Sequence, residues 1–334
     1  MPIIVVDKLT KEYQRLKRTA GLAGSIRSLF SREYETILAV NDVSFHVEEG
    51  EVVGYIGANG AGKSSTIKML VGILVPTSGL ITVRGLVPHE NRIENAKKMG
   101  VVFGQRTQLW WDIPVSESLN LMRHMFKIPE KRFNENIALF GNILDLREFI
   151  DTPVRQLSLG QRMRADICAA LLHNPDILYL DEPTIGLDVV AKERIREFIK
   201  SVNRARGTTV ILTTHDMSDI EKLCSRVMVI DKGSIVYDGQ LQQLKEKYGT
   251  EETLTIETDG GSINDKDLYK LGIQDVNRQG NRYIFRYDKR KVNSSSLIQF
   301  VLEHCQIRDF DVQQAEIEEV IRRLYLSMAD HRQG

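Results

Sequence analysis

The segment Gly57–Ser65, with the sequence GANGAGKSS, has glycines, a lysine and a serine at the spacing of a phosphate-binding turn. The run Glu51–Ile56 before it favours a strand, and the pattern from Lys63 to Leu74 favours a helix. Backbone N–H groups and the helix N-terminus would face a phosphate, Lys63 would reach the β- and γ-phosphates, and Ser64 would bind Mg²⁺. We predict that this triphosphate site comprises Gly57, Ala58, Asn59, Gly60, Ala61, Gly62, Lys63, Ser64 and Ser65.

Two consecutive carboxylates, Asp181 and Glu182, follow the four apolar residues Ile177–Leu180. A buried strand would deliver both carboxylates at its C-terminal end, where parallel α/β sheets bind their ligands. We expect Asp181 to hold Mg²⁺ through its water shell, and Glu182 to polarise the water that attacks the γ-phosphate. The pair therefore predicts hydrolysis of the nucleotide in addition to binding.

Two further polar residues, Gln105 and His215, follow strands predicted at Val101–Phe103 and Val210–Thr213. Because the carboxyl ends of parallel strands meet at one edge of a sheet, both side chains should emerge beside Glu182, where they can sense a γ-phosphate. The predicted catalytic residues are Glu182, His215 and Gln105, and the predicted Mg²⁺ ligands are Ser64, Gln105 and Asp181.

The chain is longer than one typical domain, and its patterns divide it into two. Short aliphatic strands that alternate with helices predict an α/β domain with a parallel sheet core over residues 1–249. A mostly helical stretch at about residues 105–165 is interpreted as an inserted subdomain. The composition changes after Gly249, and residues 250–334 have the strand and helix patterns of a small α+β domain without any motif of its own.

Residues 14–36 form an unusual segment between the strands predicted at Ile3–Val6 and Leu38–Val47. The segment combines lysines and arginines with apolar residues at helical spacing, which is typical of a short basic amphipathic helix. One interpretation is a solvated hairpin extension inserted in the first domain. The other is a contact with a membrane surface or a partner, and the residues allow both.

The overall composition narrows the class of partner. Lysine plus arginine equals aspartate plus glutamate at 45 each, so no nucleic-acid partner is expected. The cysteines, Cys168, Cys224 and Cys305, are isolated and lack metal-ligand spacing, so we interpret them as reduced core residues. The N-terminus has no signal-peptide pattern, and no stretch reaches the roughly 18 apolar residues of a membrane helix. We expect a cytosolic chain that reaches a membrane only through a partner.

Together with LSLGQ at Leu157–Gln161 and GLD ending at Asp188, these motifs resemble the ATP-binding-cassette (ABC) ATPases over about residues 3–245. The resemblance implies a P-loop NTPase cassette in which a parallel sheet core is joined by an antiparallel β subdomain and an inserted helical subdomain. It also implies a homodimer around two ATP molecules with Mg²⁺, and identifies His215 as the switch histidine. The chain departs from the family at Leu159, where glycine is usual. The residues implied to contact ATP of the second copy are Ser158, Gly160, Gln161 and Asp188.

The family also stacks adenine on an aromatic residue near the end of the first strand, and two tyrosines compete for that role. Tyr13, in LTKEY, fits the motif, whereas Tyr34 has the usual short spacing to the second strand because residues 14–36 look like an insertion. We prefer Tyr13 and keep Tyr34 as the alternative. Stacking on either ring tolerates different bases and contributes roughly 1–3 kcal/mol.

The segment after Gln105 reads RTQLWWDIPVSESL, with Trp110 and Trp111 side by side. Neighbouring tryptophans in a polar loop suit an interface, although one of them could pack in the core of the helical subdomain. By resemblance this loop receives a cytosolic helix of a membrane permease. Residues 250–334 resemble the small C-terminal domain of ATPases paired with ABC-2 type exporters, which implies export and a peripheral place at the cytoplasmic side of the membrane. The alternatives are a soluble cassette that acts on ribosomes or DNA, and an importer ATPase.

Overall fold

The computed structural model describes residues 1–16, 34–104, 106–261, 263–264, 268, 271–273 and 275–331. The chain divides into two compact units, Met1–Gly239 and Gln240–Gly334. The division precedes the composition change after Gly249, because helix α9 (Leu241–Tyr248) contacts helix α12 (Ile317–His331) within the second unit.

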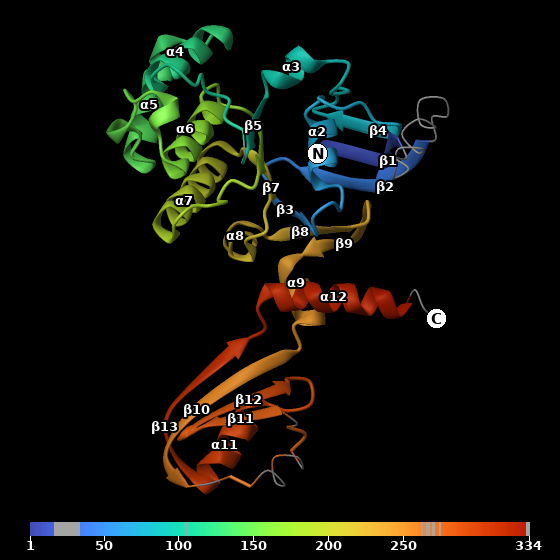
Figure 1. Cartoon of the computed structure of the whole chain (residues 1–334), viewed down its shortest axis with the longest axis vertical. Helices are drawn as coiled ribbons and strands as arrows, with labels where there is room; N and C mark the ends of the chain where they lie inside the picture. The colour runs from blue at the N-terminus through green and yellow to red at the C-terminus, as the bar shows by residue number, and fades with distance from the viewer. Residues whose placement is uncertain are drawn as a thin grey trace, which may run out of the picture. The chain divides into compact units, whose positions relative to one another are not determined.

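A six-stranded sheet with the strand order β5-β6-β7-β3-β8-β9 forms the centre of the first unit (Figure 1). The pairs β5/β6, β6/β7, β7/β3 and β3/β8 are all parallel. The side chains of β6 and β7 are buried almost throughout, as in parallel strands covered on both faces. The predicted α/β fold with a parallel core is confirmed. The strands are β3 (Val52–Gly57), β5 (Met99–Phe103), β6 (Ile177–Asp181), β7 (Thr209–Thr213), β8 (Arg226–Asp231) and β9 (Ser234–Gln240).

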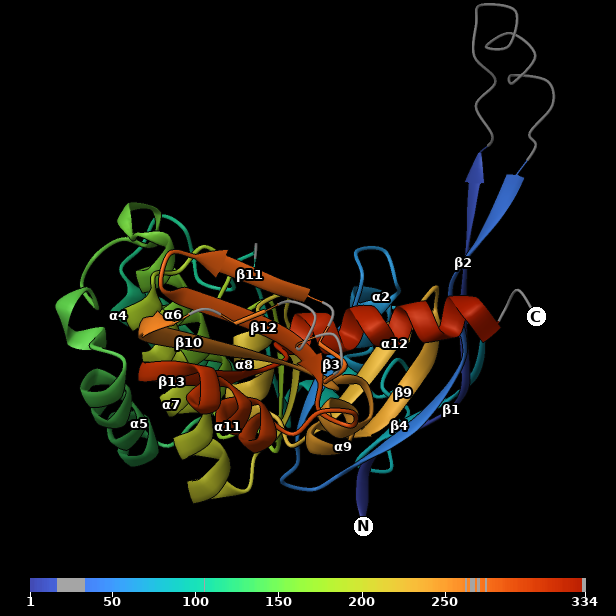
Figure 2. The ribbon, with the colours of Figure 1, turned by 90° about the horizontal axis from the view of Figure 1, so that it is seen from below.

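A second, antiparallel sheet in the same unit has the order β2-β1-β4 and contains β1 (Pro2–Leu16), β2 (Tyr34–Glu48) and β4 (Ser78–Val83). The pairing of β1 with β4 stops at Thr10, whereas β1 and β2 stay paired as far as the rung of Leu16 with Tyr34. The two strands thus continue as a two-stranded ribbon, which is visible in Figure 2. The ends of the predicted 14–36 insertion belong to this hairpin, and the amphipathic helix proposed for its centre lies outside the described residues.

The helix after the glycine-rich turn, α2 (Lys63–Leu70), is held by a core that both sheets share. Ile67, Met69 and Leu70 of α2 are buried in one hydrophobic cluster with residues of the two sheets. Phe45 of β2 and Tyr55 of β3 are part of it, with ring centroids 6.0 Å apart. The turn before α2 is therefore anchored on both sides by packed apolar side chains.

The remaining helices of the first unit lie between the strands of the parallel sheet in sequence. Helices α4, α5 and α6 gather at one side of the unit in Figure 1, which agrees with the helical pattern predicted at about 105–165, although α6 runs further than that range. Buried apolar residues such as Ile167 and Leu171 explain why α6 continues. The helices are α3 (Arg92–Ala96), α4 (Val115–Met125), α5 (Glu130–Ile143), α6 (Leu159–Leu171), α7 (Val189–Arg206) and α8 (Met217–Leu223).

The second unit is built on a four-stranded sheet with the order β11-β12-β10-β13. Apolar residues of this sheet, such as Leu254 and Phe285, form a core with Leu297 and Val301 of helix α11. One strand, DVNRQ, was missed by the sequence reading because it is polar, exposed and at the sheet edge. The elements of this unit after α9 are β10 (Glu251–Gly261), β11 (Asp275–Gln279), β12 (Arg282–Asp288), α11 (Ser294–His304), β13 (Cys305–Gln314) and α12.

The cysteines and the helices bear on two further expectations. Cys168, Cys224 and Cys305 are all buried and unpaired by disulfides, which confirms their interpretation as core residues. Burial raises the pKa of the Cys168 and Cys224 thiols, so both stay protonated and inert at neutral pH. Within the described residues, no helix combines the length and the apolar character needed to cross a membrane.

Candidate functional site

The glycine-rich turn connects the end of β3 to the start of α2, as predicted. Gly60 and Gly62 have φ angles of 80° and 110°, in the left-handed region that favours glycine. A Cβ atom on Gly62 would lie 2.3 Å from the carbonyl oxygen of Ala39, and one on Gly57 would lie 2.3 Å from that of Ile230. Glycine at these positions lets the turn close tightly against β2 and β8.

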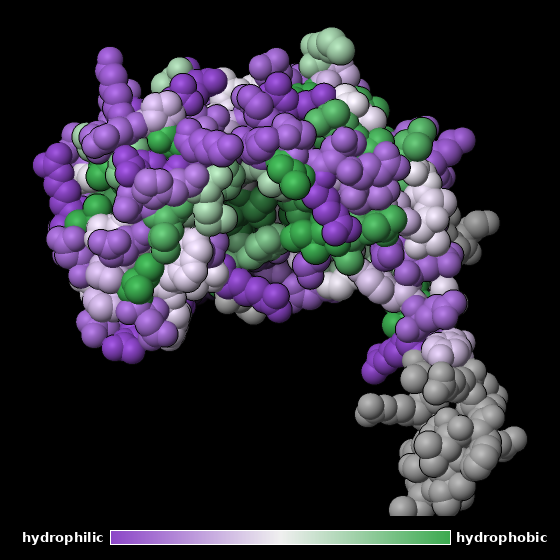
Figure 3. All heavy atoms as spheres, turned by 90° about the horizontal axis from the view of Figure 1, so that it is seen from above, coloured by the Kyte–Doolittle hydropathy of each residue, from purple (hydrophilic) through white to green (hydrophobic). Residues whose placement is uncertain are grey.

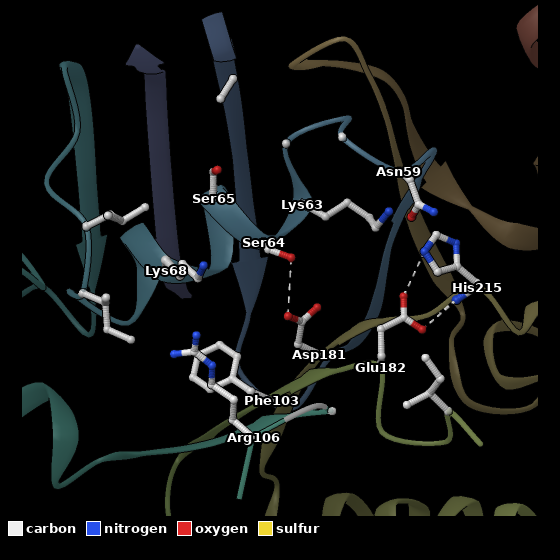
Figure 4. Close-up of a pocket in the computed structure, with 17 residues that line it drawn as sticks. Asn59, Lys63, Ser64, Ser65, Lys68, Phe103, Arg106, Asp181, Glu182 and His215 are labelled. Atoms are coloured by element: carbon white, nitrogen blue, oxygen red, sulfur yellow. Dashed lines mark hydrogen bonds and ion pairs between the residues drawn. The ribbon is translucent and has the colours of Figure 1, made fainter. Parts of the chain in front are cut away.

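Lys63 is the first residue of α2, and its ammonium group lies beneath the turn (Figure 4). Its Nζ donates hydrogen bonds to the carbonyl oxygens of Gly57, at 2.7 Å, and Ala58, at 3.1 Å. Burial lowers the pKa of this ammonium group, while the negative charges of Glu182 and Asp181 act in the opposite direction. The turn thus holds a cation directly below its backbone, in the position that can pair with a phosphate.

Asp181 ends β6 in register with Phe103 of β5 and Thr213 of β7. The Thr213 hydroxyl donates a hydrogen bond of 2.5 Å to Oδ1 of Asp181, and the Ser64 hydroxyl donates one of 3.4 Å to Oδ2. The carboxylate is therefore oriented by two hydroxyl groups from neighbouring elements. Sequence reasoning missed Thr213, because a threonine at a strand end is ordinarily explained by β propensity alone.

Glu182 follows β6 with a φ of 58°, a left-handed conformation that is uncommon for glutamate. Its backbone N–H donates to the Thr213 carbonyl oxygen at 2.9 Å. Its carboxylate contacts His215 twice: Oε1 lies 3.2 Å from Nε2, and Oε2 accepts from the backbone N–H at 3.2 Å. The turn directs the carboxylate into the cleft beside Lys63 (Figure 4), where it can accept a proton from water.

Lys63, Ser64, Asp181, Glu182 and His215 line one cleft of about 770 Å³, a size that suits a nucleotide. The structure thereby brings together the turn, Asp181, Glu182 and His215, as predicted from the strand ends. Gln105 lies outside the described residues. Two cations that the sequence analysis did not single out, Lys68 and Arg106, also line the cleft (Figure 4). The described residues that line it are Ala39, Asn59, Gly60, Gly62, Lys63, Ser64, Ser65, Lys68, Ile73, Leu74, Phe103, Gly104, Arg106, Asp181, Glu182, Ile185 and His215.

The LSLGQ segment and Asp188 begin two different helices. The Ser158 hydroxyl accepts from the Gln161 backbone N–H at 3.2 Å, and the Gln161 side chain accepts from the Ser158 N–H at 3.0 Å, which forms a capping box at α6. Asp188 caps α7 by accepting from the Ala191 N–H at 2.8 Å. None of the residues given above as lining the cleft of the same chain comes from these two caps.

The two candidate tyrosines differ in their distance from the turn. The Tyr13 hydroxyl lies 3.3 Å from the hydroxyl of Ser65 on α2. Tyr34 pairs with Leu16, three rungs beyond the pair of Tyr13 with Ile37. At the strand rise per residue, Tyr34 is about 10 Å further along the ribbon. The geometry therefore favours Tyr13 as the ring beside the cleft.

The loop with the two tryptophans is anchored to α6 while its indoles stay exposed. Trp110 and Trp111 are 41% and 49% exposed, so neither is a core residue. The buried Asp166 carboxylate on α6 accepts from the Thr107 hydroxyl at 2.9 Å and from the Gln108 N–H at 3.0 Å. Burial raises the pKa of Asp166 to about 6, against these hydrogen bonds. The loop is thus held at its base and presents aromatic surface at its tip.

Comparisons with known proteins place this geometry in a family. Residues 40–185 match the family model described as ABC transporter. The ABC transporter ATP-binding protein NatA of Bacillus subtilis (strain 168) is 33% identical over 223 residues, which cover 67% of this chain and 90% of NatA. The linearmycin resistance ATP-binding protein LnrL of the same strain is 29% identical over 302 residues, which cover 86% of this chain and 93% of LnrL. The dimeric structure of the ATP-binding cassette MJ0796, in a post-hydrolysis state bound to ADP and Pi, is similar with a TM-score of 0.59 and 26% identity, covering 71% of this chain and 98% of that chain.

The match to the family model includes all residues given above as lining the cleft except Ala39 and His215. The match to NatA extends over two thirds of this chain and most of that protein. The resemblance seen in the motifs is thereby confirmed: the chain belongs to the ATP-binding-cassette family of transporter ATP-binding proteins, and it is an ATPase.

Proposed function

We propose that the chain binds and hydrolyses ATP in a homodimer and thereby drives export through a separate membrane permease. The observation that carries the proposal is the convergence of Lys63, Asp181, Glu182 and His215 in one cleft below a glycine-rich turn. In this assignment the turn binds the triphosphate through its N–H groups, and Lys63 neutralises the β- and γ-phosphates. Tyr13 stacks the adenine.

The chemistry of the donors suits Mg²⁺ bound together with the nucleotide. The described residues contain no group of three or more His, Cys, Asp or Glu side chains able to hold a metal ion by themselves. Mg²⁺ does not require such a cage, since it is usually held by one or two carboxylates together with substrate phosphates. Ser64 and Asp181 would hold the ion, with Gln105 implied by the family. When bound, Mg²⁺ neutralises charge that develops on the phosphate oxygens.

Glu182 is the proposed general base, and His215 fixes its orientation. The double contact between the two residues restricts the carboxylate to one direction in the cleft. Replacing Glu182 by glutamine keeps the size and the hydrogen-bonding capacity of the side chain but removes its basicity. We expect Glu182→Gln to retain ATP binding, to accumulate an ATP-bound dimer and to lose hydrolysis by orders of magnitude. Turnover at the wild-type rate in this variant would remove Glu182 from its role.

The caps of α6 and α7 are assigned to the ATP of the second copy. Gly160 supports this assignment, because the chain itself does not need a glycine there. Its φ is not positive, and an added Cβ would make only an ordinary contact of 3.7 Å with Leu187. A glycine whose backbone conformation alanine can also adopt costs about 0.4–1 kcal/mol of stability relative to alanine. A close approach of the partner-bound nucleotide would explain why the position stays open, with Ser158 and Gln161 beside it in the same turn.

The exposed surface of the first unit and the similar proteins support the proposed permease and the direction of transport. Hydrophobic side chains gather around a hollow in the face seen in Figure 3, which carries α3 and α4. The exposed Trp110 and Trp111 offer aromatic anchors for a cytosolic helix of the permease. The similarity to the linearmycin resistance protein LnrL, which extends over most of both chains, and to a Nod factor export ATP-binding protein supports export. The ABC-2 type of the permease is proposed from the resemblance of residues 250–334 to the C-terminal domain of ATPases paired with such exporters. Such a chain would lie at the cytoplasmic side of the membrane.

Co-purification from detergent-solubilised membranes tests this part separately from ATP hydrolysis. We expect a multi-helix membrane protein to accompany the wild-type chain and to be lost with the Trp110→Ala/Trp111→Ala double variant, whose basal ATPase stays intact. Leu139→Ala, an exposed leucine on α5, is the control. Ribosomes, nucleic acid or a permease of the importer type in place of an exporter would refute the transport assignment.

A further inference from the structure

The LSLGQ segment and the loop Ile185–Asp188 contact each other within one chain. A Cβ atom built on Gly186 would lie 2.7 Å from Cδ2 of Leu159, so the leucine side chain lies directly over this glycine. In the opposite direction, a Cβ on Gly160 would lie 3.7 Å from Cδ2 of Leu187. Each segment therefore places a leucine over the glycine of the other, and the two segments interlock.

The loop under Leu159 connects the general base to the cap of α7. It follows Glu182 after Pro183 and Thr184. Its turns are closed by hydrogen bonds from Ile185 N–H to the Glu182 carbonyl oxygen, at 3.4 Å, and from Leu187 N–H to the Thr184 carbonyl oxygen, at 3.3 Å. Gly186 has a φ of 70°, in the left-handed region that favours glycine. An added Cβ would also collide with Leu159, so both the backbone and the packing require a glycine here. Leu159 thus touches the segment that links hydrolysis to the face of the second copy.

Neither the cap nor the helix α6 requires a leucine side chain at position 159. Its backbone begins α6, but Ser158 and Gln161 already form the cap, and alanine would serve the helix at least as well. Leu159 is an exposed residue, at 36%, so burial in the hydrophobic core does not account for a leucine at this position. A glycine at this position, which is usual in the family, has no side chain to make the packing contact that Leu159 makes with Gly186.

We propose that Leu159 is a positioning residue that fixes the Ser158–Gln161 turn against the Ile185–Asp188 loop, so that both close on the partner's ATP as one body. The proposal rests on the function proposed above for Ser158 and Asp188. Segments that are fixed relative to each other before association lose less conformational freedom when the dimer forms. Leu159 therefore favours the closed dimer without touching the nucleotide of its own chain.

The test compares leucine variants in the Glu182→Gln background, in which the ATP-bound dimer accumulates. ATP-dependent dimerisation is measured by sedimentation velocity over a protein concentration series, and ATP binding to the monomer is measured at low protein concentration with a fluorescent ATP analogue. We expect Leu159→Ala to weaken the dimer about fivefold, at the lower end of typical coupling between sites, with monomer affinity unchanged. Leu159→Met should restore most of the loss, and Leu139→Ala, with a leucine of nearly equal exposure on α5, should resemble the parent.

The outcomes separate this proposal from the function on which it rests. If Leu159→Ala dimerises as the parent does while Gly160→Ala does not, the positioning role is wrong and the trans contact to ATP stands. If neither variant affects the dimer, the trans contact fails and the role of Leu159 fails with it. A parallel loss of thermal stability and of monomer ATP affinity in Leu159→Ala would also overturn the proposal, because it would indicate a general packing defect.

Discussion

Gly160→Ala should stabilise the isolated chain and weaken its ATP-dependent dimer. Gly160 is the second residue of α6, and its φ is not positive, so alanine fits the backbone. The new Cβ would lie 3.7 Å from Leu187 Cδ2, which is an ordinary van der Waals contact. Replacing a glycine by alanine where alanine can adopt the native backbone then adds about 0.4–1 kcal/mol to the free energy of unfolding. For a unit of this size, that corresponds to a rise in Tm of about 1–4 °C.

The opposite effect on the dimer follows from the space that the added methyl group occupies. If the partner's nucleotide approaches the backbone of α6 at Gly160, a methyl group there separates the two surfaces. Losing even one phosphate hydrogen bond to a backbone N–H, at about 1.5–3 kcal/mol for a charged acceptor, weakens dimerisation about tenfold or more. Differential scanning fluorimetry without nucleotide gives the first quantity, and sedimentation with ATP in the Glu182→Gln background gives the second.

Gly141→Ala in α5 is the matched control, since it is also a glycine-to-alanine change inside a helix. Its Cβ would lie only 3.0 Å from Nε of Arg147, so this side chain must shift and the gain in stability should be smaller. Its dimerisation should equal that of the parent. If Gly160→Ala were less stable than the parent, the claim that alanine fits at this position without strain would be refuted. If it dimerised normally, the claim that the space above Gly160 receives the partner's nucleotide would be refuted.

Three further changes test individual contacts. Tyr13→Ala should weaken ATP binding by roughly 1–3 kcal/mol, whereas Tyr34→Ala should leave it unchanged, and equal titration curves for Tyr13→Ala and wild type would contradict the choice of ring. Thr213→Val removes the hydroxyl that donates to Asp181 and should raise the Mg²⁺ concentration for half-maximal hydrolysis about tenfold, which a Mg²⁺ titration of ATPase activity measures. The pKa of Asp166 is about 6 in the folded chain, above its ordinary 3.8, so the folded state binds more protons between these values. The free energy of unfolding should therefore fall by up to about 3 kcal/mol as pH rises from about 4 to about 6, and urea unfolding of Asp166→Asn should lack this component while wild type shows it.

The turn and the carboxylates of the cleft were predictable from the sequence because each has a local signature, whereas Lys68 and Arg106 have none. The spacing of Gly57–Ser65 defines a turn between a strand and a helix, and the apolar run before Asp181 defines a buried strand. Once both strands belong to one parallel sheet, their carboxyl ends must meet, which also places His215 beside Glu182. Geometry of this kind follows from the hydrophobic periodicity of the segments and the order of strands and helices along the chain, without knowledge of side-chain contacts.

Contacts between distant segments were not predictable, because no pattern within either segment encodes them. Thr213 orients Asp181 across the sheet, and Asp166 holds a loop that precedes it by almost sixty residues. The choice between Tyr13 and Tyr34 depended on the register of the ribbon, in which a displacement of three rungs moves a ring by about 10 Å. The edge strand β11 lacks the apolar alternation by which strands are recognised.

The two halves of the proposed ATP site differ in what the contacts within one chain do for their residues. In the half that belongs to Lys63, each functional group already has a partner that fixes its direction, so the site is preorganised before a second copy arrives. In the half that faces the second copy, Ser158 and Asp188 already cap helices of their own chain, and their removal would destabilise α6 or α7 by about 1 kcal/mol each. Alanine at either cap therefore mixes a folding defect with a loss of nucleotide contact. Gly160 and Leu159 lack that double role, and substitutions at these two positions separate the dimer from the fold.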